Sequence, residues 1–193
     1  MDWPQDKQSL LNIGRKRIAD FCNANSFSVP EVIVVPKSDW SYGVCAYYRP
    51  SYIKICPELC QSPCSENKSR NWTWPGSTTD REPYGVLAHE LGHHVDWTVS
   101  ERKGDYYGDF SIATRSKSGE KKISGYCPND AEWFAEMFRV FVTNPDLLKH
   151  LRPITYGLFA EKWKPVTTNS WADELGGNVP DRVLRALGNK GAK

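Results

Sequence analysis

The distribution of histidine constrains this chain more than any other feature of its sequence. The 193 residues contain four histidines, and three of them fall within six positions, in the segment His-Glu-Leu-Gly-His-His that begins at His89. Pro83 opens the apolar stretch around this segment, and proline is well placed in the first turn of a helix. We therefore expect a helix over about 83–98, with His89 and His93 on one face because they are one turn apart.

This H-E-x-x-H spacing favours a metal site. Imidazoles at i and i+4 of a helix can reach one ion, and zinc prefers nitrogen ligands in a tetrahedral shell that stays open at one position in catalytic sites. Glu90 directly follows the first histidine, so its carboxylate is available to take a proton from a water molecule at that position. The sequence thus predicts Zn²⁺ bound by His89 and His93, with Glu90 as the general base. The alternative is an exposed helix that carries these residues by chance.

Other residues near the pattern limit the class of site. Metzincins would have glycine at position 96 and histidine at 99, where this chain has Asp96 and Val99, so that class is excluded. Asp96 shares the histidine face and is a candidate to orient a ligand imidazole, unless it is only a surface residue near the helix end. His94 lies off that face, and we expect it not to bind metal.

A third ligand must come from another part of the chain. Asn129 and Glu132 form a capping-box pattern at the start of an apolar segment, which predicts a buried helix over about 130–143. Glu132 and Glu136 are one turn apart on this helix, where charges are costly unless they are paired or bind metal. We expect Glu132 to be the third ligand and Glu136 to accept the other N–H of a ligand imidazole. The alternatives are a capping role for Glu132, a surface position for Glu136, and His150 as the ligand.

The remaining elements predict one α+β domain over 1–193. The expected elements are an N-terminal helix at 6–23, strands within about 31–56 (at 31–35, 42–48 and 52–56), a loop at 61–82, a long connection at 98–125 and a helical C-terminal tail at 146–193. Such a long connection without clear periodicity is often functional, and it is a candidate to shape a cleft.

Charge and hydropathy exclude two classes of partner. Lys and Arg total 25 against 23 Asp and Glu, a net charge of +2. This small excess of positive charge does not indicate binding to nucleic acid or to an anionic membrane. No apolar run approaches the roughly 18 residues that a membrane span needs. The first six residues are polar and acidic, unlike a secretory signal peptide, so we expect a cytoplasmic protein or one released without such a signal.

The cysteines leave three interpretations open. There are six, at positions 22, 45, 56, 60, 64 and 127. Cys56, Cys60 and Cys64 are evenly spaced, but not at the C-x₂-C spacing of common structural zinc sites. Reduced thiols, some disulfide pairing and a second metal site are all compatible with this pattern.

Two blocks of sequence resemble a known family. Residues 89–96, His-Glu-Leu-Gly-His-His-Val-Asp, and 129–139, with its E-x-x-x-E pattern, resemble the gluzincin metallopeptidases and are most similar to the catalytic domain of the anthrax lethal factor group. The resemblance implies a zincin-like fold, in which a small mixed sheet packs against the active-site helix and a second helix carries the glutamates. It also implies zinc binding by His89, His93 and Glu132, with Glu90 as base and Glu136 behind a ligand.

The same resemblance implies two further features of a catalytic cleft. A tyrosine just upstream of the glutamate helix stabilises the oxyanion in that family, and Tyr126 resembles it. A strand that borders the cleft pairs with extended substrate, and 43–48 or 52–56 would be that strand.

These observations lead to one expected function and two alternatives. The expected function is a zinc metalloendopeptidase that acts on protein or peptide substrates. The first alternative is a deformylase-like amide hydrolase in which Cys45 or Cys127 is the third ligand. The second is a non-catalytic, metal-stabilised module that binds DNA or protein, for which a Glu90→Gln change would leave function intact.

Overall fold

The computed structural model describes residues 6–60, 83–104, 107–123 and 128–166. Within these ranges the chain is α+β, with six α-helices and a three-stranded mixed sheet. The helices are α1 (Lys7–Ala24), α3 (Pro83–Val99), α4 (Phe110–Ser118), α5 (Asp130–Thr143), α6 (Pro145–Leu151) and α7 (Pro153–Ala160), and the strands are β1 (Glu31–Val34), β2 (Ala46–Arg49) and β3 (Tyr52–Ile55).

The sheet has the order β1-β3-β2, so β2 forms one edge and β3 lies in the middle. β1 runs parallel to β3, and β2 runs antiparallel to it with Tyr48 opposite Ile53. Of the two segments expected to border a cleft, 52–56 is therefore the central strand, and only the segment around β2 is at an edge. The strand expected at 42–48 is also shorter at its start, because pairing with β3 begins at Ala46.

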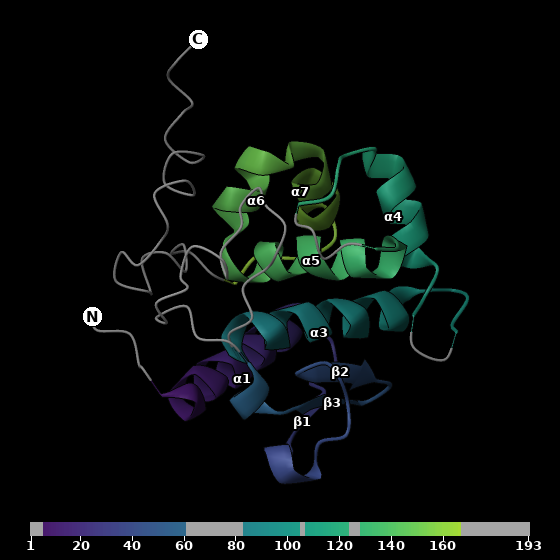
Figure 1. Cartoon of the computed structure of the whole chain (residues 1–193). Coiled ribbons are helices and arrows are strands. Elements are labelled where there is room, and N and C mark those ends of the chain that lie inside the picture. Colours follow the sequence, from purple (N-terminus) through teal and green to yellow (C-terminus); the bar gives the residue numbers. More distant parts are fainter. Residues whose placement is uncertain (1–5, 61–82, 105–106, 124–127, 167–193) are drawn as a thin grey trace.

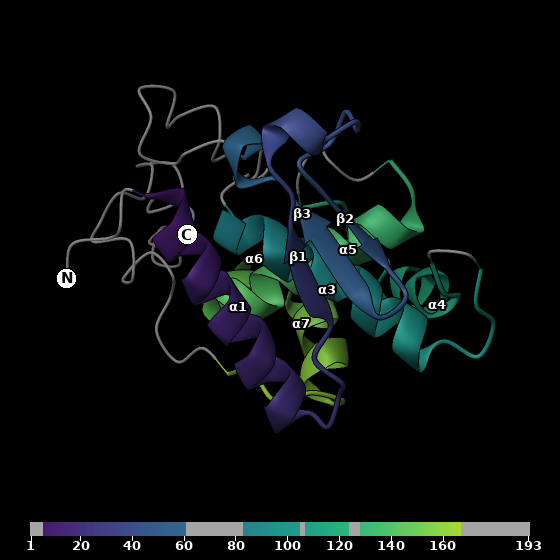
Figure 2. The same cartoon turned by 90° about the horizontal axis from the view of Figure 1, so that it is seen from below.

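The elements stack in layers around α3 (Figure 1). The sheet and α1 lie on one side of α3, and α5 lies on the other, with α4, α6 and α7 beyond it. Seen from below, the sheet covers α3 and α1 runs beside the sheet (Figure 2). This central position explains why α3 is buried from Pro83 to Asp96, polar residues included.

The core is strongly aromatic where α5 meets its neighbours. Phe134 and Phe138 of α5 stack on each other, and both contact Phe159 and Trp163. Every residue of α5 from Trp133 to Thr143 is buried, as the apolar pattern at 130–143 predicts. A rigid, tightly packed α5 gives its polar side chains fixed positions relative to α3.

The connection expected at 98–125 contains a helix that the sequence interpretation missed. α4 ends at Gly119, which adopts the left-handed conformation (φ 62°) that glycine tolerates, and Arg115 and Lys117 lie in its last turn. These end signals were present in the sequence, but nine residues with three serines show little apolar periodicity. The long connection is therefore partly ordered by α4.

The other expected elements are found close to their predicted limits. The N-terminal helix at 6–23 is α1, and the helices expected at 83–98 and 130–143 are α3 and α5. The first part of the C-terminal tail forms α6 and α7, whereas residues 167–193 and the expected loop at 61–82 lie outside the described residues. In the described ranges, no helix has both the length and the apolar content needed to cross a membrane.

No disulfide joins the four cysteines within the described ranges, Cys22, Cys45, Cys56 and Cys60, to one another.

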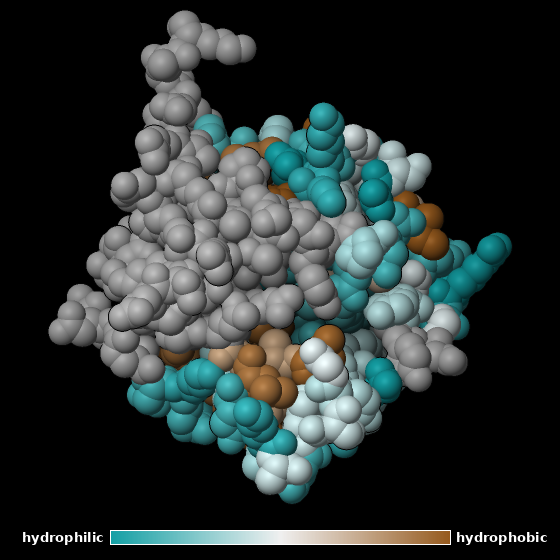
Figure 3. Space-filling model, in the orientation of Figure 1, coloured by the Kyte–Doolittle hydropathy of each residue, from teal (hydrophilic) through white to brown (hydrophobic). Residues whose placement is uncertain are grey.

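Apolar and near-neutral residues gather low on the face shown in Figure 3, over the sheet. The exposed side chains of Tyr42 and Val44, just before β2, are among the apolar residues on the sheet side of the molecule.

Candidate metal centre

α3 brings His89 and His93 together, one helical turn apart. Both side chains are buried, with exposed fractions of 7% and 4% for the whole residues, and their rings meet edge to face with centroids 4.9 Å apart. Burial of two imidazoles on one helix face requires polar partners, because an unpaired buried polar group is costly. The partners come from α5.

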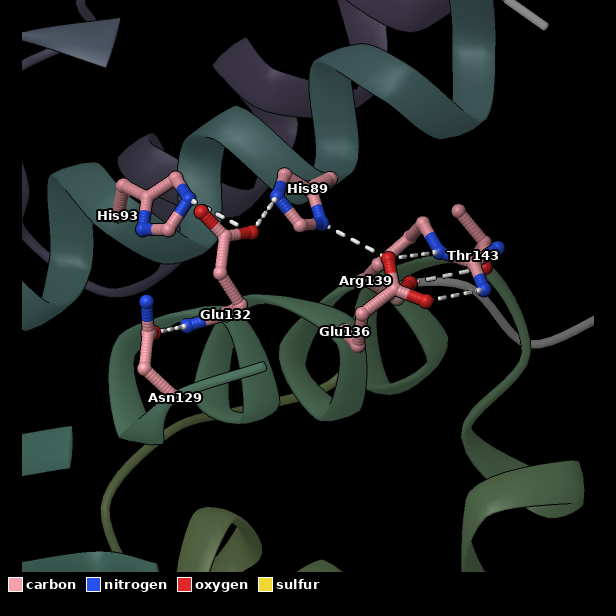
Figure 4. Close-up of polar contacts among 7 residues, drawn as sticks. All are labelled: His89, His93, Asn129, Glu132, Glu136, Arg139 and Thr143. Carbon is pink, nitrogen blue, oxygen red and sulfur yellow. Dashed lines mark hydrogen bonds and ion pairs between the residues drawn. The ribbon is translucent and has the colours of Figure 1, made fainter. Parts of the chain in front are cut away.

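α5 supplies Glu132. Asn129 caps the helix, since its side-chain oxygen accepts the backbone N–H of Glu132 at 2.9 Å. The side chain of Glu132 extends toward α3, where Oε2 lies 3.0 Å from His89 Nε2 and 3.6 Å from His93 Nε2 (Figure 4). The capping pattern and the contact with the histidines are therefore compatible, because the first uses the backbone of Glu132 and the second its carboxylate.

These three side chains form a group with the properties of a metal site. One ligand atom from each of His89, His93 and Glu132 lies within 4.8 Å of the others. Adjacent ligands of a tetrahedral zinc ion are about 3.3 Å apart, given bonds of roughly 2.0–2.1 Å. The distances of 3.0 and 3.6 Å from Glu132 Oε2 to the two nitrogens fall on either side of that value.

The hydrogen bonds around His89 indicate why a cation suits this group. Glu136 Oε1 lies 2.8 Å from His89 Nδ1, and a carboxylate can only accept, so Nδ1 carries the proton. In a neutral His89 the opposite nitrogen, Nε2, then presents a lone pair to Glu132 Oε2. Oε2 is buried and has no donor among the described residues except the two imidazoles. Two acceptors 3.0 Å apart repel unless a proton or a metal ion lies between them, so these residues could hold a metal ion.

The ionisation of the group follows from the same contacts. Burial lowers the pKa of His89, but hydrogen bonds and charges from Glu132 and Glu136 outweigh burial and hold that pKa well above its usual value. Burial raises the pKa of Glu132, and the two histidines outweigh it and hold that pKa well below its usual range. Without metal, these contacts therefore favour a protonated His89 ring beside an ionised Glu132 carboxylate.

Glu136 is held from its other side by Arg139. Both residues are almost fully buried, with exposed fractions of 1% and 2%. Arg139 Nε lies 3.3 Å from Glu136 Oε1, and its Nη2 lies 3.4 Å from Oε2. The sequence interpretation places Glu136 behind a ligand imidazole, and the structure gives it that contact with His89, but the role of Arg139 was missed. The E-x-x-R spacing on one helix face was the available signal.

Glu90 opens into the same pocket as the three candidate ligands. The pocket has a volume of about 150 Å³, and its other walls are formed by β2, by Val44 shortly before it, and by Tyr107. Burial raises the pKa of Glu90, while His89, His93 and the backbone of Tyr48 oppose this rise. A buried carboxylate that lines the same pocket as candidate metal ligands is placed to accept a proton there.

Asp96 is buried on the histidine face of α3, but its hydrogen bonds differ from the expected ones. Its carboxylate accepts the backbone N–H of Gly108 at 3.1 Å and of Ser111 at 2.7 Å, and no imidazole is among its partners in the described residues. Gly108 approaches so closely that a Cβ there would lie 1.8 Å from Ser100 Oγ. Asp96 therefore fixes the chain after α3 instead of a ligand ring.

That fixed segment brings Tyr107 to the pocket, a residue that the sequence interpretation missed. Its ring lies 5.3 Å from that of His93, and its exposed fraction is 42%. The backbone carbonyl of Tyr107 also accepts the N–H of Gly104 at 2.9 Å. No periodicity marks this tyrosine, because its position depends on the contacts of Asp96.

The other candidate residues lie elsewhere. Tyr126 and Cys127 are outside the described residues, so the expected role of Tyr126 has no structural counterpart. His94 Nε2 contacts the carbonyl of Ser28 at 3.0 Å, away from the ligand group, as expected. Cys45 and His150 do not belong to the metal-binding group, which among the described residues contains only His89, His93 and Glu132.

The site is thus assembled from two helices that are 30 or more residues apart in sequence, with an edge strand and Tyr107 around it. The assignment of this group as a candidate metal site therefore depends on its geometry and on the spacing of its residues in the sequence. No protein-family model, no curated protein and no solved structure matches this chain.

Proposed function

We propose that this chain is a zinc-dependent metalloendopeptidase with a zincin-like fold, of the gluzincin type. The observation that carries the proposal is the convergence of His89, His93 and Glu132 beside Glu90 in one pocket. Two imidazoles and one carboxylate are the ligand set of several catalytic zinc sites, and a tetrahedral ion bound by three protein groups keeps one position open. When bound, zinc would lower the pKa of a water molecule and polarise a substrate carbonyl.

In this proposal Glu90 is the general base. Glu90 directly follows His89 and lines the pocket, and burial raises the pKa of its carboxylate. A carboxylate of raised pKa holds a proton more readily than an exposed one, which suits a group that takes a proton from water and passes it to a leaving amine. Glu136 keeps the His89 ring oriented through the contact between its Oε1 and Nδ1.

The edge strand offers a way to hold an extended peptide. The backbone N–H of Cys56 donates to the carbonyl of Cys45 at 2.8 Å, so residues 45, 47 and 49 are the ones that exchange hydrogen bonds with β3. The main-chain groups of Ala46 and Tyr48 alternate with them and point away from β3, and both residues line the pocket. A substrate strand would pair with these groups.

The test combines metal analysis with peptide cleavage. Purified protein should contain one zinc per chain, and it should cleave labelled casein or a peptide mixture, with products identified by mass spectrometry. Glu90→Gln should keep the zinc and lose cleavage, because it removes the proton acceptor but none of the ligands. Glu161→Gln, at an exposed position after α7, is the matched control and should behave like the wild type.

Ligand variants separate this proposal from its alternatives. Glu132→Ala and His89→Ala should both lose zinc. Full zinc content in both variants would contradict the proposed centre, and zinc loss in Cys45→Ser with retention in Glu132→Ala would indicate a cysteine ligand instead. Full cleavage by Glu90→Gln would contradict the proposed mechanism.

A further inference from the structure

Arg139 is a buried charge that the proposed mechanism does not use. It lies on α5, seven residues after Glu132, and its exposed fraction is 2%. Its neighbours along the helix, Phe138 and Val140, belong to the apolar core. Replacing a buried ion pair by apolar residues is often neutral or stabilising, so the stability of the fold alone does not explain a guanidinium at this position.

The contacts of Arg139 lead directly to the candidate metal ligands. Its Nε approaches Glu136 Oε1 at 3.3 Å, and its Nη2 approaches Oε2 at 3.4 Å, so both carboxylate oxygens face the guanidinium. The same Oε1 accepts from His89 Nδ1 at 2.8 Å. Figure 4 shows the resulting series, in which Glu136 lies between His89 of α3 and Arg139 of its own helix.

We propose that Arg139 is a positioning residue that sets the metal affinity of the centre through Glu136 and His89. This inference rests on the proposed zinc centre. The guanidinium makes two contacts in one plane, and these fix the orientation of the Glu136 carboxylate. A carboxylate oriented in this way accepts from Nδ1 and so holds His89 in the tautomer whose Nε2 lone pair faces the ion, which makes that nitrogen a stronger ligand.

The local backbone supports this role. Glu136 and Arg139 are separated by three positions, so their side chains leave the helix on the same face. Thr143 Oγ1 donates to the carbonyl of Arg139 at 2.8 Å, which adds a contact one turn further along the helix. Lysine, with a single point charge, cannot reproduce two contacts from one planar group.

A double-mutant cycle on zinc affinity tests the proposal without any substrate. The dissociation constant for zinc would be measured by competition with a chromogenic chelator for the wild type, Arg139→Met, Glu136→Gln and the double variant. Removing groups behind a ligand typically weakens metal binding by about 10–100-fold. We expect Arg139→Met to weaken zinc binding by about tenfold or more. The double variant should match Glu136→Gln within about twofold, because Arg139 acts only through Glu136.

Two further variants distinguish positioning from general stability. Arg139→Lys keeps the charge and should give an affinity between those of the wild type and Arg139→Met, even if Arg139→Met folds poorly. Arg115→Met is the matched control. Arg115 of α4 pairs at 2.6 Å with Asp130 at the start of α5, where both side chains are partly exposed, so the variant should bind zinc like the wild type. Circular dichroism of the zinc-free proteins reports whether each variant is folded.

The outcomes separate failure of this inference from failure of the proposed function. Wild-type zinc affinity in a folded Arg139→Met or Arg139→Lys would overturn the inference and leave the zinc centre intact. Independent effects, in which the losses of Arg139→Met and Glu136→Gln multiply in the double variant, would also overturn it. Absence of zinc binding by the wild type would overturn both.

Discussion

At the scale of single residues, His89 is the centre of the site because it faces two carboxylates. Glu132 lies at its Nε2 and Glu136 at its Nδ1, at 3.0 and 2.8 Å. Their charges hold the pKa of His89 above its usual value despite burial, which favours a second proton on this ring when no metal is bound. A proton on Nε2 would occupy the position between His89 and Glu132 where we propose that zinc binds.

Zinc binding should therefore release protons from His89, because the ion takes the place of a proton on Nε2. Glu132 adds none, because its lowered pKa keeps it ionised. Calorimetric titration with zinc in buffers of different ionisation enthalpy measures how many protons are released. Glu136→Gln removes one of the two charges that raise the pKa of His89, so this variant should release fewer protons. Zinc binding with no proton release in the wild type would contradict the assignment.

His94, the neighbour of a candidate ligand, predicts a pH dependence of stability. Its Nε2 donates to the Ser28 carbonyl, while its Nδ1 is buried without a partner among the described residues. Burial lowers the pKa of His94, and the Ser28 contact only partly opposes this. His94 therefore binds a proton more readily in the unfolded chain than in the folded one. Its contribution to the unfolding free energy is fully present above pH 6.5, the usual pKa of histidine, and is lost as the pH falls from there toward the pKa of His94 in the folded protein.

His94→Gln keeps a side-chain N–H donor and removes this titration. Between pH 6.5 and 5.5 the metal-free variant should lose less unfolding free energy than the wild type, by up to about 1.4 kcal/mol, the effect of one proton over one pH unit. Urea unfolding at the two pH values gives the comparison. Equal losses in the two proteins would show that His94 takes no part in the pH dependence.

At the scale of elements, the contact between α3 and α5 sets the distance across the site. Gly92 allows this contact, since a Cβ at that position would lie 2.7 Å from the Cα of Ala135. The element that approaches Gly92 is therefore the glutamate helix, α5. His93 directly follows Gly92, so a change in the spacing of the helices would also move a candidate ligand.

Gly92→Ala should destabilise the protein although alanine favours helices. Overpacking against backbone typically costs about 1–3 kcal/mol, which exceeds the helix-propensity gain of about 1 kcal/mol. Gly157→Ala in α7 is the matched control, because a Cβ there meets nothing within 4 Å and the change should be neutral or stabilising. Chemical unfolding of both variants measures the difference. A Gly92→Ala protein as stable as the control would contradict the close approach.

The elements also show what the sequence could and could not predict. The limits of α3 and α5 follow from local signals, namely Pro83 at the start of one and the Asn129 cap at the start of the other. The short helix α4 and the late start of β2 depend on tertiary contacts that outweigh weak local preferences. Pairing with β3 decides where β2 begins, and no residue between 42 and 46 signals that limit.

The candidate site divides in the same way. His89, Glu90 and His93 share one turn of helix, and Glu132 and Glu136 share another, so spacing alone was sufficient to group each set. The role of Asp96 was misassigned because its partners, the N–H groups of Gly108 and Ser111, are backbone atoms that carry no sequence signature. Tyr107, directly before Gly108, depends on those same backbone contacts, and sequence spacing could not place it.

At the scale of the whole molecule, the candidate metal centre joins two layers that already pack together. α3 lies against the sheet and α1 on one side and against α5 on the other (Figure 1). The aromatic cluster of Phe134, Phe138, Phe159 and Trp163 is buried without any contribution from the histidines. The metal-free protein should therefore stay folded, unlike small domains whose core depends on zinc.

Zinc should nevertheless raise the unfolding temperature, because a ligand held by both α3 and α5 binds only the folded chain. At a free zinc concentration about 100 times the dissociation constant, the stabilisation is about 2.7 kcal/mol, which for a chain of this size corresponds to roughly 5–10 °C. Thermal unfolding with zinc and with excess chelator measures the shift, and Glu132→Ala should abolish it while still unfolding cooperatively. A zinc-dependent shift of wild-type size in Glu132→Ala would mean that the stabilising ion is bound elsewhere, and that α5 does not take part in binding it.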